Sequence, residues 1–415
     1  MKLIWQNEHY PDVVRGGGGA VNTFYIVREL QQLGHDPLIL ARGDRDSSAA
    51  REEYRGTPVL RIPPPRLPER LWPIWPLLEA RYAAPGLALL TGPYDGFVAI
   101  DHAFALAVKR IHPDRPLVYR IESIARSHAA SVAATAPSRS FAARKRAWVE
   151  RAMVAENEWV DRRVWARADA LVVKSEFMKR ELERLYGLVT ARLHVIPNGV
   201  DHTRYSGITP GTRVLEEIGN ADRAKIVISF CGRLVRMKNV PLLLAAFARM
   251  KSRACCVLVI VGDGDERAAL ERTAGELGID DAVRFVGKTD RLEEYLAASD
   301  ISVLPSTYEP FGNVLLEAMA AGLPCVALEP DDVTIRTASK EIIEDGRTGL
   351  FVPGGDPEPL ARALDGLVGS PELRKTLGQQ AQAACRARYS WKACAAAYAD
   401  LLMNAPNRRE GRGGP

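Results

Sequence analysis

The sequence predicts two α/β domains in tandem, each built on a parallel sheet covered by helices. Its 415 residues, 47% of them hydrophobic, exceed the size at which a single hydrophobic core usually stops growing. Short apolar runs recur along the chain, each followed by a longer helical pattern, and this alternation is typical of parallel sheets. The series is interrupted once, by a stretch rich in proline and glycine around residues 197–211, and then restarts. We therefore expect an α/β protein of two domains.

Each apolar run has the length of a buried strand. The runs are KLIW, PLIL, FVAI, PLVYRI and ALVV in the first half and IVISF, CVLVIV, VRFVG, ISVLP, PCVAL and GLFV in the second. On this pattern we expect a first domain over residues 1–204, a linker over 205–222 and a second domain over 223–385. An amphipathic pattern predicts a last helix within residues 386–406, and the tail over 407–415 is expected to be disordered.

The composition favours a cytoplasmic protein. The N-terminal residues MKLIWQNEHY lack the apolar stretch of a secretory signal, and no apolar window reaches the roughly 18 uninterrupted residues that a membrane span needs. The six cysteines show no metal-ligand spacing and are expected to be reduced thiols in a reducing compartment. The scattered prolines and glycines, with 26% charged residues, exclude fibrous and wholly disordered classes.

Basic side chains are concentrated between Arg144 and Arg167, where they alternate with acidic and aromatic residues. This pattern fits a solvated helix face on which long side chains extend to water. It also fits attraction to an anionic acceptor, or peripheral contact with the anionic inner face of a membrane. No nucleic-acid-binding motif accompanies the charge, so nucleic acid is not an expected partner.

The most informative segment is ISVLPSTYEPFGNVLLEAMAAGLPCVAL, residues 301–328. A buried strand leads into a loop, and Pro310 and Gly312 mark the start of a helix. The free N–H groups at this helix start then lie at the mouth of the sheet, where they favour an anion such as phosphate. Glu309 precedes the helix and Glu317 lies more than a turn inside it. One carboxylate can therefore contact a sugar and the other a ribose.

Two cations follow the first strand of the same domain. The strand ends at Cys231 and Gly232, and Arg233 and Lys238 come next. At the carboxyl edge of a parallel sheet, such side chains can neutralise a diphosphate and stabilise it as a leaving group. Both are candidate catalytic residues, and the alternative is that they are ordinary surface charges.

A glycine-rich turn is expected in the first domain. Gly16 to Gly19 precede the helical pattern AVNTFYIVRELQQLG, so their backbone amides are expected to be free at a helix start. The alternative is a merely flexible turn. Asn22 stands where a dinucleotide-binding fingerprint has its third glycine, so the spacing argues against a dehydrogenase.

Seven segments follow one another along the chain in an informative order. They are GGGGAVNTFYIVRELQQLGH, RADALVVKSEFMKREL, VIPNGVD, FCGRLVRMKN, VIVGDGDERAALE, VRFVGKTDRLEEYLAASDISVLPSTYEPFGNVLLEAMAAGLPCVAL and EIIEDGRTGLFVPGGDPEPLARAL. In this order they resemble family 4 of the retaining glycosyltransferases over nearly the whole chain. The resemblance implies the GT-B architecture, in which two Rossmann-like α/β domains with parallel sheets face each other across a cleft. It also implies a nucleotide-sugar site in the C-terminal domain, most of the acceptor site in the N-terminal domain, and a final helix that crosses back to the first domain.

Carried over by position, the resemblance assigns roles to single residues. Arg233 and Lys238 would bind the diphosphate. Glu309 would contact the transferred sugar, and Glu317 the ribose hydroxyls. The backbone of residues 312–314 would contact phosphate, and that of residues 286–288 the base. The remaining donor-binding candidates are Gly17, Gly18, Gly19, Gly287, Lys288, Phe311, Gly312, Asn313 and Val314.

One position departs from the family pattern. Many relatives end the strand that corresponds to PLVYRIES with a histidine that reaches the donor sugar, and here Glu122 occupies that position. Either Glu122 replaces this histidine, or His102, after an earlier strand, contributes from nearby. Both are candidate catalytic residues, and a purely structural role for His102 stays open. In retaining enzymes of this kind the reaction takes place on one face of the sugar, and the leaving diphosphate assists the acceptor hydroxyl.

The resemblance implies no metal and no cofactor besides the co-substrate, a UDP- or GDP-sugar, because arginine and lysine neutralise the diphosphate. Asp331 and Asp332 are accordingly expected in a solvated loop. The expected activity is retaining transfer of a hexose to a hydroxyl of a small-molecule, polysaccharide or lipid-linked acceptor. The alternative is a non-catalytic relative that keeps the fold and binds a sugar nucleotide or a polyanion.

Overall fold

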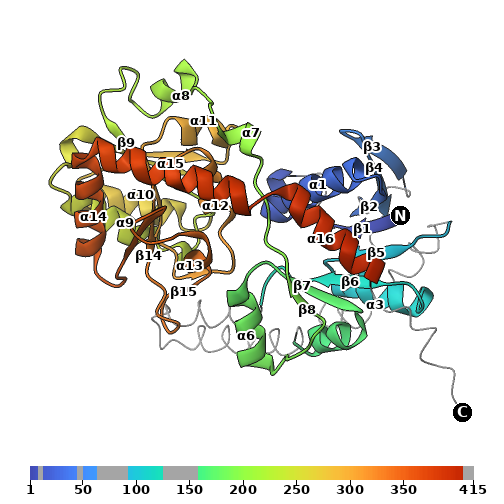
Figure 1. Ribbon diagram of the computed structural model, residues 1–415. Coiled ribbons are helices and arrows are strands. Elements are labelled where there is room, and N and C mark those ends of the chain that lie inside the picture. Colours follow the sequence, from blue (N-terminus) through green and yellow to red (C-terminus); the bar gives the residue numbers. More distant parts are fainter. Residues whose placement is uncertain (8–12, 44–49, 63–91, 125–157, 405–415) are drawn as a thin grey trace, which may run out of the picture. The chain divides into compact units, whose positions relative to one another are not determined.

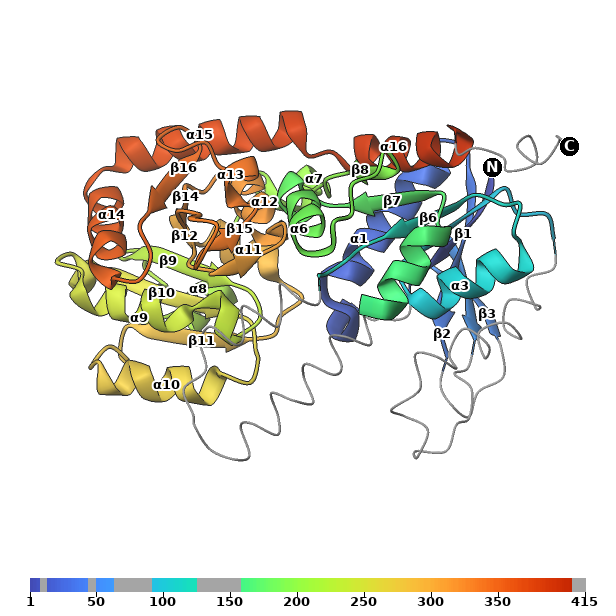
Figure 2. The same ribbon diagram turned by 90° about the horizontal axis from the view of Figure 1, so that it is seen from below.

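The computed structural model describes residues 1–7, 13–43, 50–62, 92–124 and 158–404, with the backbone alone for 13–18. These residues form two compact units (Figures 1 and 2). Unit 1 contains the described residues up to Gly199 and those from Trp391 onward, and unit 2 extends from Val200 to Ser390. Both units combine helices with a mainly parallel sheet, so the predicted fold class is confirmed.

The described residues of unit 1 form an eight-stranded sheet in the order β3-β4-β2-β1-β5-β6-β7-β8. Its strands are β1 (Lys2–Gln6), β2 (Asp36–Arg42), β3 (Ala50–Tyr54), β4 (Thr57–Ile62), β5 (Gly96–Ala99), β6 (Leu117–Arg120), β7 (Ala170–Val173) and β8 (Leu193–Val195). All pairs are parallel except β3 with β4. The central strands are buried over almost their whole length, which explains why they are continuous apolar runs rather than alternating ones.

The helices of unit 1 include one from the far end of the chain. Among the described residues they are α1 (Val13–Gln32), α3 (His102–Ile111), a helix over residues 158–167, α6 (Glu176–Tyr186) and α16 (Trp391–Asn404). α16 lies beside α1 (Figure 1). The Trp391 ring stacks on Tyr25 with centroids 5.4 Å apart, and Tyr398 meets Trp5 edge-on at 5.0 Å. These aromatic contacts make α16 part of the hydrophobic core of unit 1.

Unit 2 contains, among the described residues, a six-stranded parallel sheet in the order β11-β10-β9-β12-β14-β16. Its strands are β9 (Ile226–Cys231), β10 (Cys256–Val261), β11 (Val283–Gly287), β12 (Ile301–Leu304), β14 (Cys325–Leu328) and β16 (Gly349–Val352). Figure 2 shows them in this order, from β16 near α15 to β11. The strand order reverses between β9 and β12. Ligands of open parallel sheets bind at such a reversal, outside the carboxyl ends of the strands.

Helices cover both faces of this sheet, and a small two-stranded sheet lies beyond β12. The helices are α7 (His202–Tyr205), α8 (Thr212–Glu217), η2 (Arg236–Lys238), α9 (Val240–Arg249), η3 (Arg253–Cys255), α10 (Arg267–Glu276), α11 (Leu292–Ala297), α12 (Asn313–Ala320), α13 (Ser339–Ile342), α14 (Pro357–Gly369) and α15 (Pro371–Arg388). The small sheet pairs β13 (Tyr308–Glu309) with β15 (Arg336–Thr337). None of the helices that the structure describes is both long and apolar enough to cross a bilayer.

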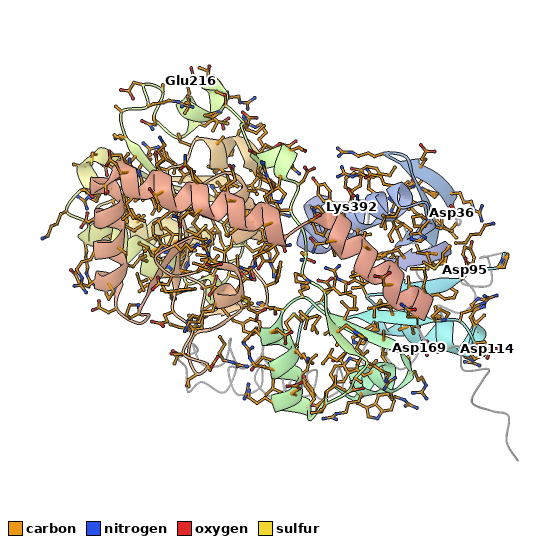
Figure 3. The ribbon with its side chains drawn as sticks, viewed as in Figure 1. Asp36, Asp95, Asp114, Asp169, Glu216 and Lys392 are labelled. Atoms are coloured by element: carbon orange, nitrogen blue, oxygen red, sulfur yellow. The ribbon has the colours of Figure 1, made fainter. Side chains whose placement is uncertain are left out.

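Aspartates at the amino ends of the strands fix the backbone there. The carboxylate of Asp95 accepts from the N–H of Lys2 at 2.7 Å, and that of Asp169 accepts from the N–H of Leu117 at 2.8 Å. Asp300 does the same for β9 in unit 2. Figure 3 shows Asp95 and Asp169 toward the same end of unit 1. Aspartate side chains thus accept hydrogen bonds from backbone N–H groups at the amino ends of these strands. The loops that carry the predicted site follow the carboxyl ends.

Two predicted boundaries are wrong. The segment expected to be a linker, 205–222, contains α8, and the units divide at Gly199 instead. Val214 and Ile218, spaced four apart, are both fully buried, so this apolar pair anchors the segment to the core of unit 2 despite its prolines and glycines. At the other end α15 continues to Arg388, and α16 begins only at Trp391. The tail over 407–415 lies outside the described residues.

The prediction that Gly16 to Gly19 precede their helix is also wrong. α1 begins at Val13 and includes all four glycines. Only the N–H groups of the N-cap residue and of the first three helical residues lack a partner within a helix, and Gly16 to Gly19 all lie beyond that set. Helices grow by one hydrogen bond per residue once nucleated, so the buried stretch from Ala20 onward explains the extension. Each glycine still weakens the helix by about 1 kcal/mol relative to alanine.

Candidate active site

The loop after β9 carries the two predicted cations. The chain turns at Gly232 and enters η2, which ends at Lys238. The Lys238 side chain is largely buried, with 14% of its surface exposed. Arg233 is exposed, and within the described part of the chain it forms no ion pair. Lys238 is therefore fixed by protein contacts, whereas Arg233 is open to solvent.

The structure brings Glu309 to Lys238. Backbone bonds align the two segments: the Thr307 N–H donates to the Met237 carbonyl at 2.9 Å, and the Ala338 N–H donates to the Glu309 carbonyl at 2.9 Å. The side chains of Lys238 and Glu309 form an ion pair in which Glu309 is 13% exposed. Glu309 was expected in a loop but lies in β13, because this short strand pairs with β15. Two residues 71 positions apart thus form one charged pair at the carboxyl edge of the sheet.

The predicted helix start after Gly312 is confirmed. Gly312 has a φ of +102°, which favours glycine, and α12 begins at Asn313. Its N-cap residue, Gly312, has no side chain that could cap this end, and the positive end of the helix dipole here favours an anion. A Cβ at Gly312 would lie 3.4 Å from Cγ of Glu309, which places the helix start beside the Lys238–Glu309 pair. Phe311 is buried and fixes the approach to the helix.

Glu317 lies on α12, and its partners differ from those of Glu309. Its carboxylate forms a hydrogen bond with the Tyr205 hydroxyl, and Arg204 and Glu293 are its charged neighbours. Burial raises the pKa of Glu317 to about 7, against the lowering influence of Arg204 and of the Tyr205 hydroxyl. This carboxyl is therefore poised to change its charge near neutrality. Sequence reasoning found Glu317 but not its partners on α7.

Gly287 ends the edge strand β11, and Lys288 follows it. The carbonyl of Gly287 accepts from the N–H of Gly262 at 2.9 Å, and Lys288 is exposed. A cavity of about 380 Å³ opens beside β11, and its lining includes the apolar side chains of Phe285 and Val286 as well as Lys288. A ligand with an aromatic ring beside an anionic group could contact the apolar side chains of Phe285 and Val286 with its ring and the Lys288 ammonium with its anion.

Two glycines after β10 were not singled out from the sequence, although they hold this edge together. A Cβ at Gly262 would lie 1.9 Å from the carbonyl oxygen of Gly232, and one at Gly264 would lie 2.3 Å from that of Leu234. The N–H of Leu234 donates to the carbonyl of Asp263 at 2.9 Å. The GDG sequence after an apolar strand was the available signal. This close backbone contact sets the path of the loop that carries Arg233.

In unit 1 the candidate Glu122 lies between two cations. Its oxygens are 2.5 Å from Nε of Arg120 and 2.7 Å from Nζ of Lys174, and Arg120 also donates to Asn198 at 2.8 Å. Burial alone would raise the pKa of Glu122, but Arg120 and Lys174 overcome this and hold it at about 2. Arg120 is only 1% exposed. Glu122 is therefore a fixed negative charge that neutralises a buried guanidinium.

His102 has a different partner. It is the first residue of α3, and its Nε2 lies 2.7 Å from Oδ1 of Asp161. The buried Tyr119 ring is 5.9 Å from the imidazole. Burial raises the pKa of Tyr119 well above its ordinary value, and the charges of Asp161, Asp101 and Glu122 add to this. The structure thus places Asp161 and Tyr119 beside His102 at the carboxyl edge of this sheet.

Asp331 does not gather other acidic groups around it. Its carboxylate accepts from the N–H groups of Val333, Thr334 and Ile335, so it organises a tight turn, and Asp332 is exposed in the same turn. Over the described ranges, no group of three histidine, cysteine or acidic side chains is arranged to hold a metal ion.

Solved structures with the same architecture include two that the chain covers almost completely. Sucrose-phosphate synthase from Thermosynechococcus elongatus has a TM-score of 0.75 at 21% identity, over 97% of this chain and 98% of the other. HepE of Anabaena in complex with UDP and glucose has a TM-score of 0.73 at 20% identity, over 97% and 100%. Together with the two parallel α/β units, this similarity defines the GT-B class of fold.

The family follows from the sequence matches. The model of Glycosyltransferase Family 4 matches residues 16–204, and that of Glycosyl transferases group 1 matches residues 213–384. The chain therefore belongs to glycosyltransferase family 4. D-inositol 3-phosphate glycosyltransferase 2 of Catenulispora acidiphila is 35% identical over 263 residues, which is 60% of this chain and 58% of that relative. The match thus spans little more than half the length of the curated relative.

Proposed function

We propose that the protein is a retaining glycosyltransferase that moves a hexose from a UDP- or GDP-sugar to a hydroxyl group. The observation that carries the proposal is the ion pair of Lys238 with Glu309 beside the start of α12. A cation for the diphosphate, a carboxylate for the sugar and a helix N-terminus that favours phosphate are thus adjacent. Membership of the family and the similarity to HepE, described with UDP and glucose, support it.

The proposed reaction needs no separate base. The bond between the anomeric carbon and the diphosphate oxygen breaks while Arg233 and Lys238 stabilise the charge that develops on the diphosphate. The acceptor oxygen bonds to the same face of the anomeric carbon, and its proton passes to the departing phosphate oxygen. Because Glu309 pairs with Lys238, a sugar held by Glu309 lies next to the cation that binds the leaving group.

The rest of the donor is assigned to groups around this pair. Glu317 is proposed to accept from the ribose hydroxyls, and the backbone of residues 312–314, after Phe311, to contact phosphate. The base is proposed to contact the backbone of residues 286–288, at Gly287 and Lys288, where the cavity beside β11 opens. Gly17 to Gly19 remain candidates for contact with the donor through their lack of side chains.

On the acceptor side we propose different roles for His102 and Glu122. A carboxylate with a pKa of about 2 is a poor proton acceptor near neutral pH, so Glu122 is proposed to position Arg120 and Lys174. His102, one-third exposed and oriented by Asp161, is proposed to contact the sugar or the acceptor. Both roles can be tested by substitution.

The acceptor is proposed to be a hydroxyl compound with a negative charge, whether a small molecule, a polysaccharide or a lipid-linked sugar. The name of the Catenulispora relative specifies a phosphorylated inositol. Most of the basic stretch between Arg144 and Arg167 lies outside the described residues. In its described part, the Arg163 guanidinium lies 4.2 Å from the ring centre of Trp159, which is 47% exposed. Such a cation–π pair on the surface suits an anionic partner.

A donor panel tests the proposed function. The protein would be incubated with UDP-, GDP- and ADP-sugars, and release of free nucleoside diphosphate and the anomeric form of the product would be followed by NMR. We expect release from a UDP- or GDP-sugar and a product with retained configuration. Tight binding of a donor without any release would favour the non-catalytic alternative, and an inverted product would contradict the proposed reaction.

A further inference from the structure

The one-turn helix α7 supports the middle of α12 from within unit 2. It begins at His202, just after the boundary between the units, and its N–H groups are capped by Asp201. Tyr205 at its end is 6% exposed and belongs to the core of unit 2. Its hydroxyl forms the hydrogen bond with Glu317. The aromatic ring is therefore fixed by packing while its polar end reaches the carboxylate.

Arg204 is held just as firmly. Its guanidinium lies 2.9 Å from Oε2 of Glu293 on α11 and donates to the carbonyl of Asp290 at 3.3 Å. It also lies 5.7 Å from the ring centre of Tyr205. The contacts with Glu293 and Asp290 join α7 to the loop and helix that follow β11. Arg204 is thereby kept near Glu317, where its charge favours the carboxylate.

The charged and titratable groups around Glu317 come from three other elements. α7 supplies Arg204 and Tyr205, α11 supplies Glu293, and β9 supplies the buried Cys231. Arg204 and Tyr205 favour the carboxylate, whereas burial and Glu293 favour the neutral acid. Because these opposing effects leave the pKa of Glu317 at about 7, its charge near neutral pH depends on Arg204, Tyr205 and Glu293.

We propose that Tyr205 and Arg204 are positioning residues of the nucleotide site, which hold the Glu317 carboxylate in place to accept from the ribose hydroxyls. The inference rests on the proposed ribose role of Glu317. A carboxylate accepts from a diol better than the neutral acid does. Nucleotide affinity therefore increases as the pH rises through the pKa of Glu317, and the neighbours set the midpoint of this increase.

The substitutions have predicted signs. Tyr205→Phe removes a donor to the carboxylate, and Arg204→Ala removes a favourable charge, so each raises the pKa of Glu317 and moves the midpoint to higher pH. Glu293→Gln removes a like charge and moves it to lower pH. At neutral pH we expect Tyr205→Phe to weaken nucleotide binding by roughly three- to tenfold, the range of one ordinary intramolecular hydrogen bond. The donor KM rises, and kcat at saturating donor changes little.

The experiment is calorimetric titration of the full chain with UDP and with GDP, from about two units below to two units above the pKa of Glu317. Tyr389→Phe is the matched control. Tyr389 is 5% exposed, and its hydroxyl donates to the backbone carbonyl of Glu341 at 2.8 Å rather than to a carboxylate. We expect its midpoint to equal that of the wild type, whereas Tyr205→Phe and Glu293→Gln shift theirs in opposite directions.

Glu317→Gln separates this inference from the proposed function. If Glu317→Gln weakens binding and leaves only the pH dependence that comes from ionisation of the nucleotide's own terminal phosphate, the ribose role holds. Unchanged midpoints in Tyr205→Phe and Arg204→Ala would then overturn the positioning role alone. If Glu317→Gln binds UDP and GDP as the wild type does, the ribose role itself is wrong. Should Tyr205→Phe fail to fold, Arg204→Ala decides the question, since no shift or a downward shift of its midpoint would contradict the inference.

Discussion

At the scale of single residues, two glutamates show how partners decide what burial does to a carboxyl group. Burial raises the pKa of Glu317 to about 7, because Arg204 and the Tyr205 hydroxyl do not outweigh it. Burial also acts to raise the pKa of Glu122, whose side chain is 26% exposed, yet Arg120 and Lys174 hold it at about 2. The first carboxyl can respond to a ligand, whereas the second is a permanent charge. We therefore expect substitution of Glu122 to lower the free energy of unfolding more than it lowers catalytic turnover.

Glu122→Gln tests this expectation. It leaves the buried Arg120 without its counter-charge, and the expected loss of unfolding free energy is about 3–5 kcal/mol. The depressed pKa means that the stabilisation is present above a pH of about 4.5 and is lost as the pH falls toward about 2. Urea unfolding measures the loss. The control is Glu52→Gln, which breaks an exposed pair with Arg61 at 2.7 Å and should cost less than about 1 kcal/mol.

Equal losses in the two variants would show that the buried position of Arg120 has no energetic consequence. The sequence predicted Glu122 at the end of a strand and Glu317 inside a helix, but it could not predict their opposite charge states. Those depend on Lys174, Arg204 and Tyr205, which lie on other elements and are far away in sequence. No local pattern connects them.

At the scale of elements, buried parallel strands were predictable because both of their faces are apolar. β9, β10 and β14 all lie where the apolar runs predicted them. The β3–β4 hairpin was missed, since AREEY is polar and almost wholly exposed and forms a strand only by pairing with β4. α1 was misjudged at its start, because tertiary burial of its later turns outweighs four glycines.

The glycine turn after β10 supplies the test at this scale. Gly264→Ala places a Cβ against the backbone of Leu234 and should lower the free energy of unfolding by more than about 2 kcal/mol, because backbone cannot move aside as a side chain can. Gly366→Ala is the control, since this glycine lies inside α14 with open space around its Cβ. That substitution should stabilise the protein by roughly 1 kcal/mol. Thermal and urea unfolding of both variants check the prediction, and equal tolerance at the two sites would contradict the close packing.

At the scale of the whole molecule, each unit has its own hydrophobic core. The core of unit 2 is drawn from residues 200–389, and that of unit 1 from residues 3–196 and 391–402. The return of the chain through α16 was implied by the family resemblance and not by any residue pattern. The pattern showed only that a last amphipathic helix follows the second sheet. Stability and nucleotide binding should therefore respond separately to substitutions in the two units.

Trp391→Ala tests this separation. The indole is 6% exposed and stacks on Tyr25, so its removal should cost unit 1 about 3–5 kcal/mol. Hydrogen exchange followed by mass spectrometry should show faster exchange in residues of unit 1 and unchanged exchange in β9, β10 and β12. Nucleoside diphosphate affinity should stay at the wild-type value. Faster exchange throughout both units, with weaker nucleotide binding, would show that the two cores unfold as one.

The central claim is that Lys238 stabilises the departing diphosphate, and the turnover of Lys238→Ala with the preferred donor tests it most directly. Arg236→Ala is the control, an exposed cation two residues earlier in η2. We predict that Lys238→Ala lowers kcat by about 10²- to 10³-fold, as loss of an electrostatic contact to a transition-state charge does, while Arg236→Ala keeps wild-type turnover. A correctly folded Lys238→Ala protein with wild-type kcat would contradict the assignment.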